Sequence, residues 1–235
     1  MTGRSSFSVE PEESALVRQG DEAFSVLKAE IVSCRLAPGA SFSEANLSAR
    51  FGLTRAAARA ALARLAEQGL VSPVARHGYT VAPVTLQSIR ELFQLRLILE
   101  PRAAAMATDR VSIQVLRELN KAPQLAHSAD DRLAFVAANR AFHRAIAAAA
   151  GHSRLYGLLE ALADEGERLV HLGLFGPGSD HSDRTAADQG HSAIIAAFET
   201  RDQTRVEQET FAHIDHAQGL ALTRLMSGAA SVPIA

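Results

Sequence analysis

The sequence contains no tryptophan, a single cysteine and only 5% aromatic residues. With Cys34 alone, no disulfide framework can form within the chain, which fits a protein of the reducing cytoplasm. Few aromatics and many alanines disfavour a β-sandwich and favour closely packed helices. No run approaches the roughly 18 uninterrupted apolar residues of a membrane span, and no apolar signal segment follows Met1. We therefore expect a cytoplasmic, mainly α protein that makes no membrane contact.

Charge is distributed unevenly, although the net charge is only −2. Residues 15–83 carry 8 Lys and Arg against 5 Asp and Glu, whereas residues 84–235 carry 15 against 18. A basic surplus favours contact with a phosphate backbone. A surplus of this size is also common on an ordinary solvated surface, so it needs support from motifs.

Two short helices joined by a glycine turn are predicted in the N-terminal third of the chain. The hydrophobic period places them over residues 43–50 and 54–68, with Gly52 in the turn. Ser43 and Thr54 stand at the helix starts, where a hydroxyl can accept a hydrogen bond from an otherwise unpaired backbone N–H. This arrangement is typical of a helix-turn-helix.

A small hairpin is predicted directly after these helices. Two β-like runs, residues 70–74 and 79–82, flank a tip that contains His77 and Gly78. Such a hairpin is the wing of a winged helix-turn-helix. A preceding helix over about residues 14–34 completes the unit.

After Pro83 the hydrophobic pattern has the period of long helices. Six helices that can run antiparallel are expected over about residues 85–108, 112–122, 130–150, 153–175, 184–200 and 202–227. The predicted fold is therefore mainly α, with an N-terminal winged helix-turn-helix and a C-terminal all-α antiparallel helical bundle. The predicted segments are a flexible tail (1–14), the winged domain (15–83), the bundle (84–228) and a second flexible tail (229–235).

Arg55 and Arg59 lie one helical turn apart near the start of the second short helix. An arginine placed there can donate two hydrogen bonds to guanine in the major groove, or pair with a phosphate. Thr54 at the helix N-terminus can add a phosphate contact, and His77 and Gly78 at the wing can reach the minor groove. Taken singly, these residues also fit two solvated arginines and an ordinary loop. Within a winged helix-turn-helix we expect them to bind double-stranded DNA.

Three histidines stand on apolar helical stripes, where a histidine is unexpected. His143, His191 and His213 belong to three different predicted helices, and Asn139 lies one turn before His143. One such histidine is more often a hydrogen-bonded core residue than a ligand. Three on inward faces can meet inside a bundle, and imidazole suits zinc, nickel or a similar divalent ion. We predict a metal site there, with a metal-free polar pocket as the alternative.

Arg96 also lies on an apolar stripe, and a buried guanidinium requires a partner. Glu100, one turn further on, can supply it through a structural ion pair. The functional alternative is a clamp for the carboxylate of a small ligand, because a planar guanidinium pairs with a carboxylate through two hydrogen bonds. The two roles are compatible.

The order of these motifs resembles the GntR family of bacterial transcription regulators, and within it the FadR-type subfamily with an all-helical (FCD) ligand domain. The N-terminal residues that carry the resemblance are Leu36-Ala37-Pro38-Gly39, Ser43-Glu44, Phe51-Gly52-Leu53-Thr54-Arg55, Arg59-Ala60-Ala61-Leu62, Arg64-Leu65, Glu67-Gln68-Gly69-Leu70-Val71 and His77-Gly78. The C-terminal ones are Arg96, Glu100, Phe142-His143, Gly151-His152, His191 and His213. The resemblance covers about residues 15–225.

The resemblance implies a transcription regulator, with repression relieved by ligand as its mode of action. A homodimer would bind a palindromic operator, because one recognition helix reads too few bases to define a unique site. The bundle would bind a small organic acid and a metal, since many members use an Asp/Asn-x3-His pair and two later histidines. In this sequence the pattern falls on Asn139, His143, His191 and His213.

The chain departs from the family pattern at a few positions. Ala45-Asn46 replaces the usual Arg-Glu, Ala56-Ala57-Ala58 replaces Thr-Pro-Val, and Asn139 replaces the commoner Asp. The side chains lost at positions 45, 56 and 57 bear on which operator is read. They do not threaten the fold, because alanine is the best helix former.

Two other functions remain open from the sequence. A histidine-rich bundle could be a metal-dependent enzyme of the hydrolase kind, although the sequence contains no H-E-x-x-H motif and no Glu-x-x-His pairs. The chain could also be a helical interaction module with a degenerate DNA-binding head.

Overall fold

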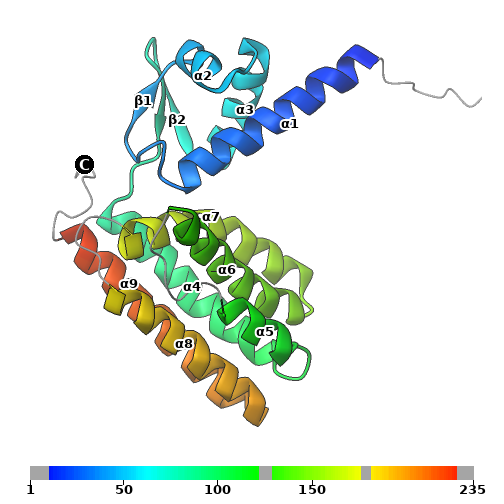
Figure 1. Ribbon diagram of the computed structural model, residues 1–235, viewed down its shortest axis with the longest axis vertical. Coiled ribbons are helices and arrows are strands. Elements are labelled where there is room, and N and C mark those ends of the chain that lie inside the picture. The colour runs from blue at the N-terminus through cyan, green and yellow to red at the C-terminus, as the bar shows by residue number, and fades with distance from the viewer. Residues whose placement is uncertain (1–10, 122–128, 176–180, 227–235) are drawn as a thin grey trace, which may run out of the picture. The chain divides into compact units, whose positions relative to one another are not determined.

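The computed structural model describes residues 11–121, 129–175 and 181–226, which form nine helices and one small sheet (Figure 1). The predicted tail at 229–235 and most of the tail at 1–14 lie outside these residues. The chain divides into two compact units, residues 1–83 and 84–235. Among the described helices, none combines the length and the apolar character that crossing a membrane requires.

The first unit is built from three helices and a three-stranded sheet. Its elements are α1 (Pro11–Val32), β1 (Ser41–Phe42), α2 (Glu44–Phe51), α3 (Arg55–Glu67), β2 (Val71–Val74) and β3 (Gly78–Val81). The strands are antiparallel in the order β1-β3-β2, with Val71 opposite Val81. The core lies where α1 packs against α3, and it includes Leu27, Ile31, Leu62 and Leu65.

Local chemistry explains where α2 and α3 begin. The Oγ of Ser43 accepts a hydrogen bond from the N–H of Asn46 at 3.1 Å, and the Oδ1 of Asn46 accepts one from the N–H of Ser43. Thr54 caps α3 in the same way, with its Oγ1 3.2 Å from the N–H of Ala57. Gly52 follows α2 at φ +65°, a left-handed conformation that glycine adopts without strain. The helix-turn-helix is therefore confirmed.

Two details of the first unit differ from the expectation. The structure starts α1 at Pro11, so residues 11–14 are helical and do not belong to a flexible tail. It also contains β1, which the hydrophobic period did not predict. A strand of two residues is too short to show a period of two, and β1 exists because Ser41 and Phe42 pair with Thr80 and Tyr79 of β3.

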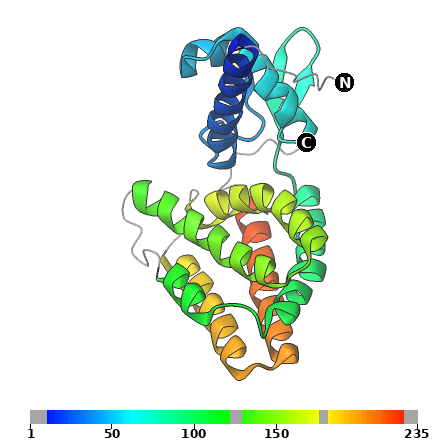
Figure 2. The ribbon, with the colours of Figure 1, turned by 90° about the vertical axis from the view of Figure 1, so that its right-hand side faces the viewer.

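The second unit contains six helices whose ends lie within a few residues of the predicted ones. They are α4 (Leu86–Ala107), α5 (Ile113–Asn120), α6 (Ala129–Ala149), α7 (Ser153–Phe175), α8 (His181–Thr200) and α9 (Gln203–Met226). The contacts of α4 with α9, α8 with α9, and α6 with α7 are the most extensive in this unit (Figures 1 and 2). The predicted helical bundle is confirmed.

The core of the second unit consists of separate apolar clusters. One is built around Phe142, Ile194 and Phe198, and another around Phe93, Leu169 and Ile214. These residues come from α4, α6, α7, α8 and α9, so the same helices that make the core also carry the histidines and Arg96.

Candidate functional site

The two arginines of α3 are exposed, as DNA binding requires. Arg55 is the first residue of α3, and Arg59 lies one turn later with 68% of its side chain exposed. The opposite face of the helix is buried through Ala58, Ala61 and Leu65. Burial of the apolar face therefore leaves both guanidinium groups on the outer surface of α3.

Glu44 of α2 holds Arg59 in one orientation. The Nε and Nη2 of Arg59 donate to the Oε2 of Glu44 at 3.1 and 3.0 Å, and Nε is 3.3 Å from Oε1. These hydrogen bonds and the charge of Glu44 raise the pKa of Arg59 above its usual value. Glu44 accepts from the Nε–H and from one of the two Nη2 hydrogens. The second Nη2 hydrogen and the Nη1 group lie on the other edge of the guanidinium and remain available to pair with guanine.

Of the other residues predicted to contact DNA, Thr54 and His77 are exposed, whereas Gly78 packs against the backbone of Phe42. Thr54 is exposed, and because its oxygen accepts the cap hydrogen bond, its hydroxyl hydrogen can still be donated to a phosphate. His77 is exposed in the turn between β2 and β3. Gly78 has an internal reason to be glycine: a Cβ at this position would lie 2.3 Å from the carbonyl oxygen of Phe42, and its φ is +93°.

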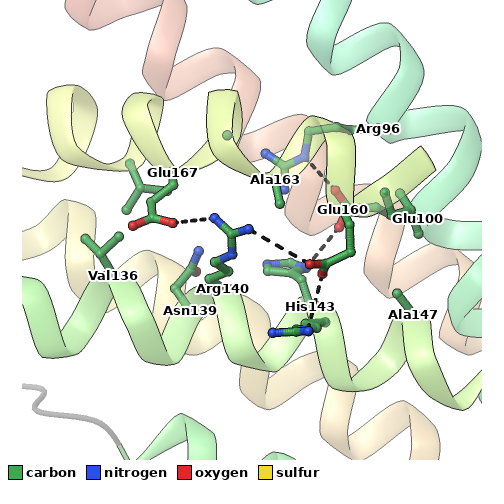
Figure 3. Close-up of a pocket in the computed structure, with 14 residues that line it drawn as sticks. Arg96, Glu100, Val136, Asn139, Arg140, His143, Ala147, Glu160, Ala163 and Glu167 are labelled. Atoms are coloured by element: carbon green, nitrogen blue, oxygen red, sulfur yellow. Dashed lines mark hydrogen bonds and ion pairs between the residues drawn. The ribbon is translucent and has the colours of Figure 1, made fainter. Parts of the chain in front are cut away.

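The three predicted histidines meet inside the second unit. Ring nitrogens of His143 (α6), His191 (α8) and His213 (α9) all lie within 4.8 Å of one another. His191 and His213 are buried, with 4% and 9% of their surface exposed. Asn139 lies one turn before His143 on α6, and both residues line the cavity drawn in Figure 3.

Hydrogen-bond acceptors stand beside the Nδ1 atoms of two of the histidines. The Nδ1 of His143 is 2.9 Å from the Oε2 of Glu100, and the Nδ1 of His191 is 3.2 Å from the Oδ1 of Asn120. Asn120 donates its amide to Ser192, which fixes the oxygen toward His191. If both Nδ1 atoms carry the hydrogen, both Nε2 atoms present lone pairs, and these atoms are only 3.4 Å apart.

The pKa values of the two buried histidines favour the neutral form that binds a metal. Burial lowers the pKa of His191 well below its usual value, and the proximity of His143 lowers it further. Burial is also the largest cause of the lowered pKa of His213. Neutral imidazoles with inward lone pairs are the form that binds a divalent cation. The residues present therefore fit a metal ion of the zinc or nickel kind.

Gly190, the residue before His191, provides space for His213. A Cβ on Gly190 would lie 2.3 Å from the Nδ1 of His213, so any side chain there would displace that ring. The spacing of the histidines gave no sign of this role, because it depends on the contact between α8 and α9.

Arg96 and Glu100 form the predicted ion pair on α4. The Nε of Arg96 donates to the Oε1 of Glu100 at 2.5 Å, and both side chains are largely buried, at 13% and 12% exposure. Burial alone would raise the pKa of Glu100, but the charge of Arg96 and the contact with His143 hold it well below the usual value. Glu100 thus links the arginine to the histidine cluster, a connection that the sequence did not reveal.

Two cavities adjoin the histidine cluster. The polar cavity lies between α6 and α7, and its charged lining residues are Arg96, Glu100, Arg140, Arg144, Glu160 and Glu167 (Figure 3). The apolar cavity lies between α4, α7 and α9, and its apolar lining includes Phe93, Leu169, Val170, Leu174, Ala217 and Leu220. Both open to solvent, so the space of about 600 and 580 Å³ between their walls includes solvent-filled volume at their mouths. Five residues line both: Arg96, Asn139, His143, Gly166 and Val170.

Comparison with known proteins agrees with both halves of this description. Residues 19–81 match the family "Bacterial regulatory proteins, gntR family", and residues 91–216 match the "FCD domain" family. The chain is 23% identical over 198 residues to the HTH-type transcriptional regulator YdhC of Bacillus subtilis strain 168, covering 82% of this chain and 86% of that protein. It is 26% identical over 196 residues to the HTH-type transcriptional repressor RspR of Escherichia coli K12, covering 81% and 83%.

Solved structures support the fold. E. coli McbR/YncC superposes with a TM-score of 0.76 at 20% identity, over 88% of this chain and 98% of that one. A GntR regulator from Rhodococcus sp. RHA1 gives a TM-score of 0.73 at 19% identity, again over 88% and 98%. With the exposed arginines of α3, a helical second unit and these matches, the chain belongs to the GntR family as a DNA-binding transcriptional regulator with an FCD domain. The family and the names of the relatives point to a transcriptional regulator and not to an enzyme.

Proposed function

We propose that this regulator is a repressor, and that it leaves its operator when a small carboxylate binds beside a divalent metal ion in the bundle. The observation that carries the proposal is the meeting of His143, His191 and His213 next to the Arg96–Glu100 pair. The E. coli relative RspR is named a transcriptional repressor, which favours repression as the direction of control.

The metal would be held by the Nε2 atoms of His143 and His191 together with a ring nitrogen of His213, and Asn139 is positioned on the same helix face as His143. With hydrogen on both Nδ1 atoms, the Nε2 atoms would present two lone pairs 3.4 Å apart, and a cation between them would remove their repulsion. Glu100 and Asn120 would fix the ring orientations as hydrogen-bond acceptors. When bound, the metal would supply a positive charge for an anionic ligand.

The carboxylate of the effector would pair with Arg96. Among the described residues, the hydrogen bond of Arg96 is made by Nε to Glu100, so Nη1 and Nη2 can donate to a ligand. Glu100 neutralises the guanidinium while the cavity is empty of ligand, which keeps a buried charge tolerable. A ligand carboxylate would approach from the cavities that Arg96 and His143 both line.

A homodimer would bind a palindromic operator. The partner face on the bundle is an exposed apolar group on α4 and α9: Leu95 is 47% exposed, Ile98 63% and Phe211 47%. α4 and α9 pack against each other, and a contiguous exposed apolar patch is typical of an interaction surface. If this face forms the dimer, Ile98→Asp should change the molecular mass measured by light scattering from that of two chains to that of one. Val115→Asp on α5, which is also an exposed apolar position, is the control and should leave the mass unchanged.

The experiment that tests the whole proposal combines metal analysis with an operator-binding assay. Purified protein is expected to contain about one divalent ion per chain and to bind the DNA upstream of its own gene in a salt-dependent way. A carboxylate effector is expected to weaken that complex, and chelation of the metal is expected to abolish the effect of the effector. Tight operator binding that no carboxylate alters, in protein with full metal content, would refute the proposal.

A further inference from the structure

Apart from Arg96, the arginines that line the polar cavity are already paired with acidic side chains of α7. Arg140 donates to Asp164 and to Glu167, both at 2.8 Å, and it lies between the acidic residues of α7 (Figure 3). Arg144 contacts Glu160 at 3.5 Å and donates to Tyr156. A ligand carboxylate that entered here would have to break these pairs and would face the α7 carboxylates.

The apolar cavity differs in chemistry. Its polar lining residues are Arg96, Asn139, His143, His213 and His216, and the rest of its wall is apolar, with Phe93, Leu169, Leu174, Leu220 and small alanines such as Ala217. A second charge that lies against the apolar part of this wall would lose its water without gaining a partner, which is strongly unfavourable. A hydrocarbon group would instead be removed from water, at a gain proportional to its buried area.

Gly166 leaves space beside the guanidinium of Arg96. Gly166 lies in the interior of α7, where glycine is unfavourable for a helix. A Cβ on Gly166 would lie 3.7 Å from the Nη1 of Arg96, in ordinary contact with the guanidinium. The glycine thus leaves one side of the donor group that would bind the ligand carboxylate uncovered.

We propose that the effector is an amphipathic monocarboxylate, with its carboxylate at Arg96 and a hydrocarbon chain or ring in the apolar cavity between α4, α7 and α9. The inference rests on the proposed function, because it assumes that a carboxylate binds at Arg96. It goes further by ranking such acids above dicarboxylates and polyhydroxy acids, whose second polar group would lose its water wherever it contacts Phe93, Leu169 and Leu220.

The test is a binding series measured by calorimetry on the full chain with its metal content determined. Acetate, butanoate, hexanoate and 3-phenylpropanoate form the series, with succinate and hexan-1-ol as controls. Each methylene that enters the cavity is expected to raise the affinity about fourfold, so hexanoate should bind on the order of 100-fold tighter than acetate. Hexan-1-ol should bind far more weakly than hexanoate, because it lacks the charge.

The outcomes separate this inference from the function on which it rests. If succinate binds tighter than hexanoate, or if affinity does not rise with chain length, the inference is wrong while a carboxylate effector survives. If no carboxylate binds, both fail. If hexan-1-ol binds as tightly as hexanoate, the carboxylate half of the proposal is wrong.

Two variants locate the hydrocarbon group. Ala217→Leu fills the apolar cavity and should remove the gain from butanoate to hexanoate, whereas Leu220→Ala enlarges the cavity and should move the preferred chain length upward. Ala212→Leu, at an exposed position of the same helix, is the matched control and should leave the series unchanged. A purely structural role of these positions would weaken all the acids equally, and that result would overturn the inference.

Discussion

The two units of the chain handle charge in opposite ways. In the first unit, Arg59 keeps 68% of its side chain exposed, and its partner Glu44 lies beside it at the surface. In the second unit, Arg96 and Glu100 are only 13% and 12% exposed, and His191 and His213 are buried close by. The first unit presents its guanidinium groups to water, whereas the second withdraws polar groups into its interior.

This difference agrees with the DNA bound by the first unit and the ligand proposed for the second. A surface that meets a polyanion can leave its charges hydrated, because the counterions that DNA releases contribute to binding. An interior site must satisfy each polar group before a ligand arrives, and the contacts of Glu100 with Arg96 and His143 do so. Changes at the surface should therefore alter binding alone, and changes in the interior should alter binding and stability together.

The largest effect is expected from removing both arginines of the recognition helix. Arg55→Ala combined with Arg59→Ala should lower operator affinity on the order of 100-fold or more, because each bidentate base contact contributes about 1–3 kcal/mol. Fluorescence anisotropy with labelled operator measures the loss, and the melting temperature should not change. Arg64→Ala is the matched control, because Arg64 of the same helix pairs with Asp21. Unchanged operator affinity in the double variant would favour a degenerate DNA-binding head.

His143→Ala should affect metal content and stability at the same time. The variant loses one ligand and the contact with Glu100, so elemental analysis should show metal near background. The melting temperature should fall as well, since a metal at a thousandfold excess over its Kd contributes about 4 kcal/mol. His77→Ala, on the first unit, should retain the metal. Full metal occupancy in the His143 variant would contradict the site drawn here.

Gly190→Ala tests the interior without removing a ligand. The new Cβ must displace the ring of His213, and the metal affinity should fall about 10- to 100-fold, as is usual when a supporting contact of a metal site is lost. Competition with a chromogenic chelator measures this affinity. Gly219→Ala on α9 is the control, because no atom lies within 4 Å of its new Cβ. Equal affinities in the two variants would show that His213 is not constrained by α8.

Glu44→Gln should produce the smallest effect, a fall in operator affinity of about threefold to tenfold, because an exposed ion pair contributes little. Removal of a negative charge near DNA would by itself strengthen binding, so a decrease isolates the loss of Arg59 orientation. Glu67→Gln at the end of α3 measures the pure charge effect. An increase in both variants would mean that Glu44 only repels DNA.

The sequence predicted the elements well because the relevant signals are local. Helix ends depend on caps such as Ser43 and Thr54, and the inward histidines were recognisable from the period of their own helices. Asn46, which replaces the residue usual in the family, still completes the cap of α2, because its side chain accepts a hydrogen bond from the N–H of Ser43.

What could not be predicted depends on contacts between distant segments. The pairing of Glu44 with Arg59, of Asn120 with His191, and of Gly190 with His213 each requires the packing of two helices. The strand β1 likewise forms only by pairing with β3. No period or motif within one helix carries that information.

The helix that bears Arg96 is also the one that follows the wing along the chain. β3 ends at Val81 and α4 begins at Leu86, so a short connector joins the two units. From Leu86 to Arg96 the chain runs through about three turns of helix, which behave as a stiff rod. The residue proposed to bind the effector and the segment that leads into the first unit therefore lie on one uninterrupted stretch of helix, which gives α4 a direct covalent connection to the DNA-binding unit.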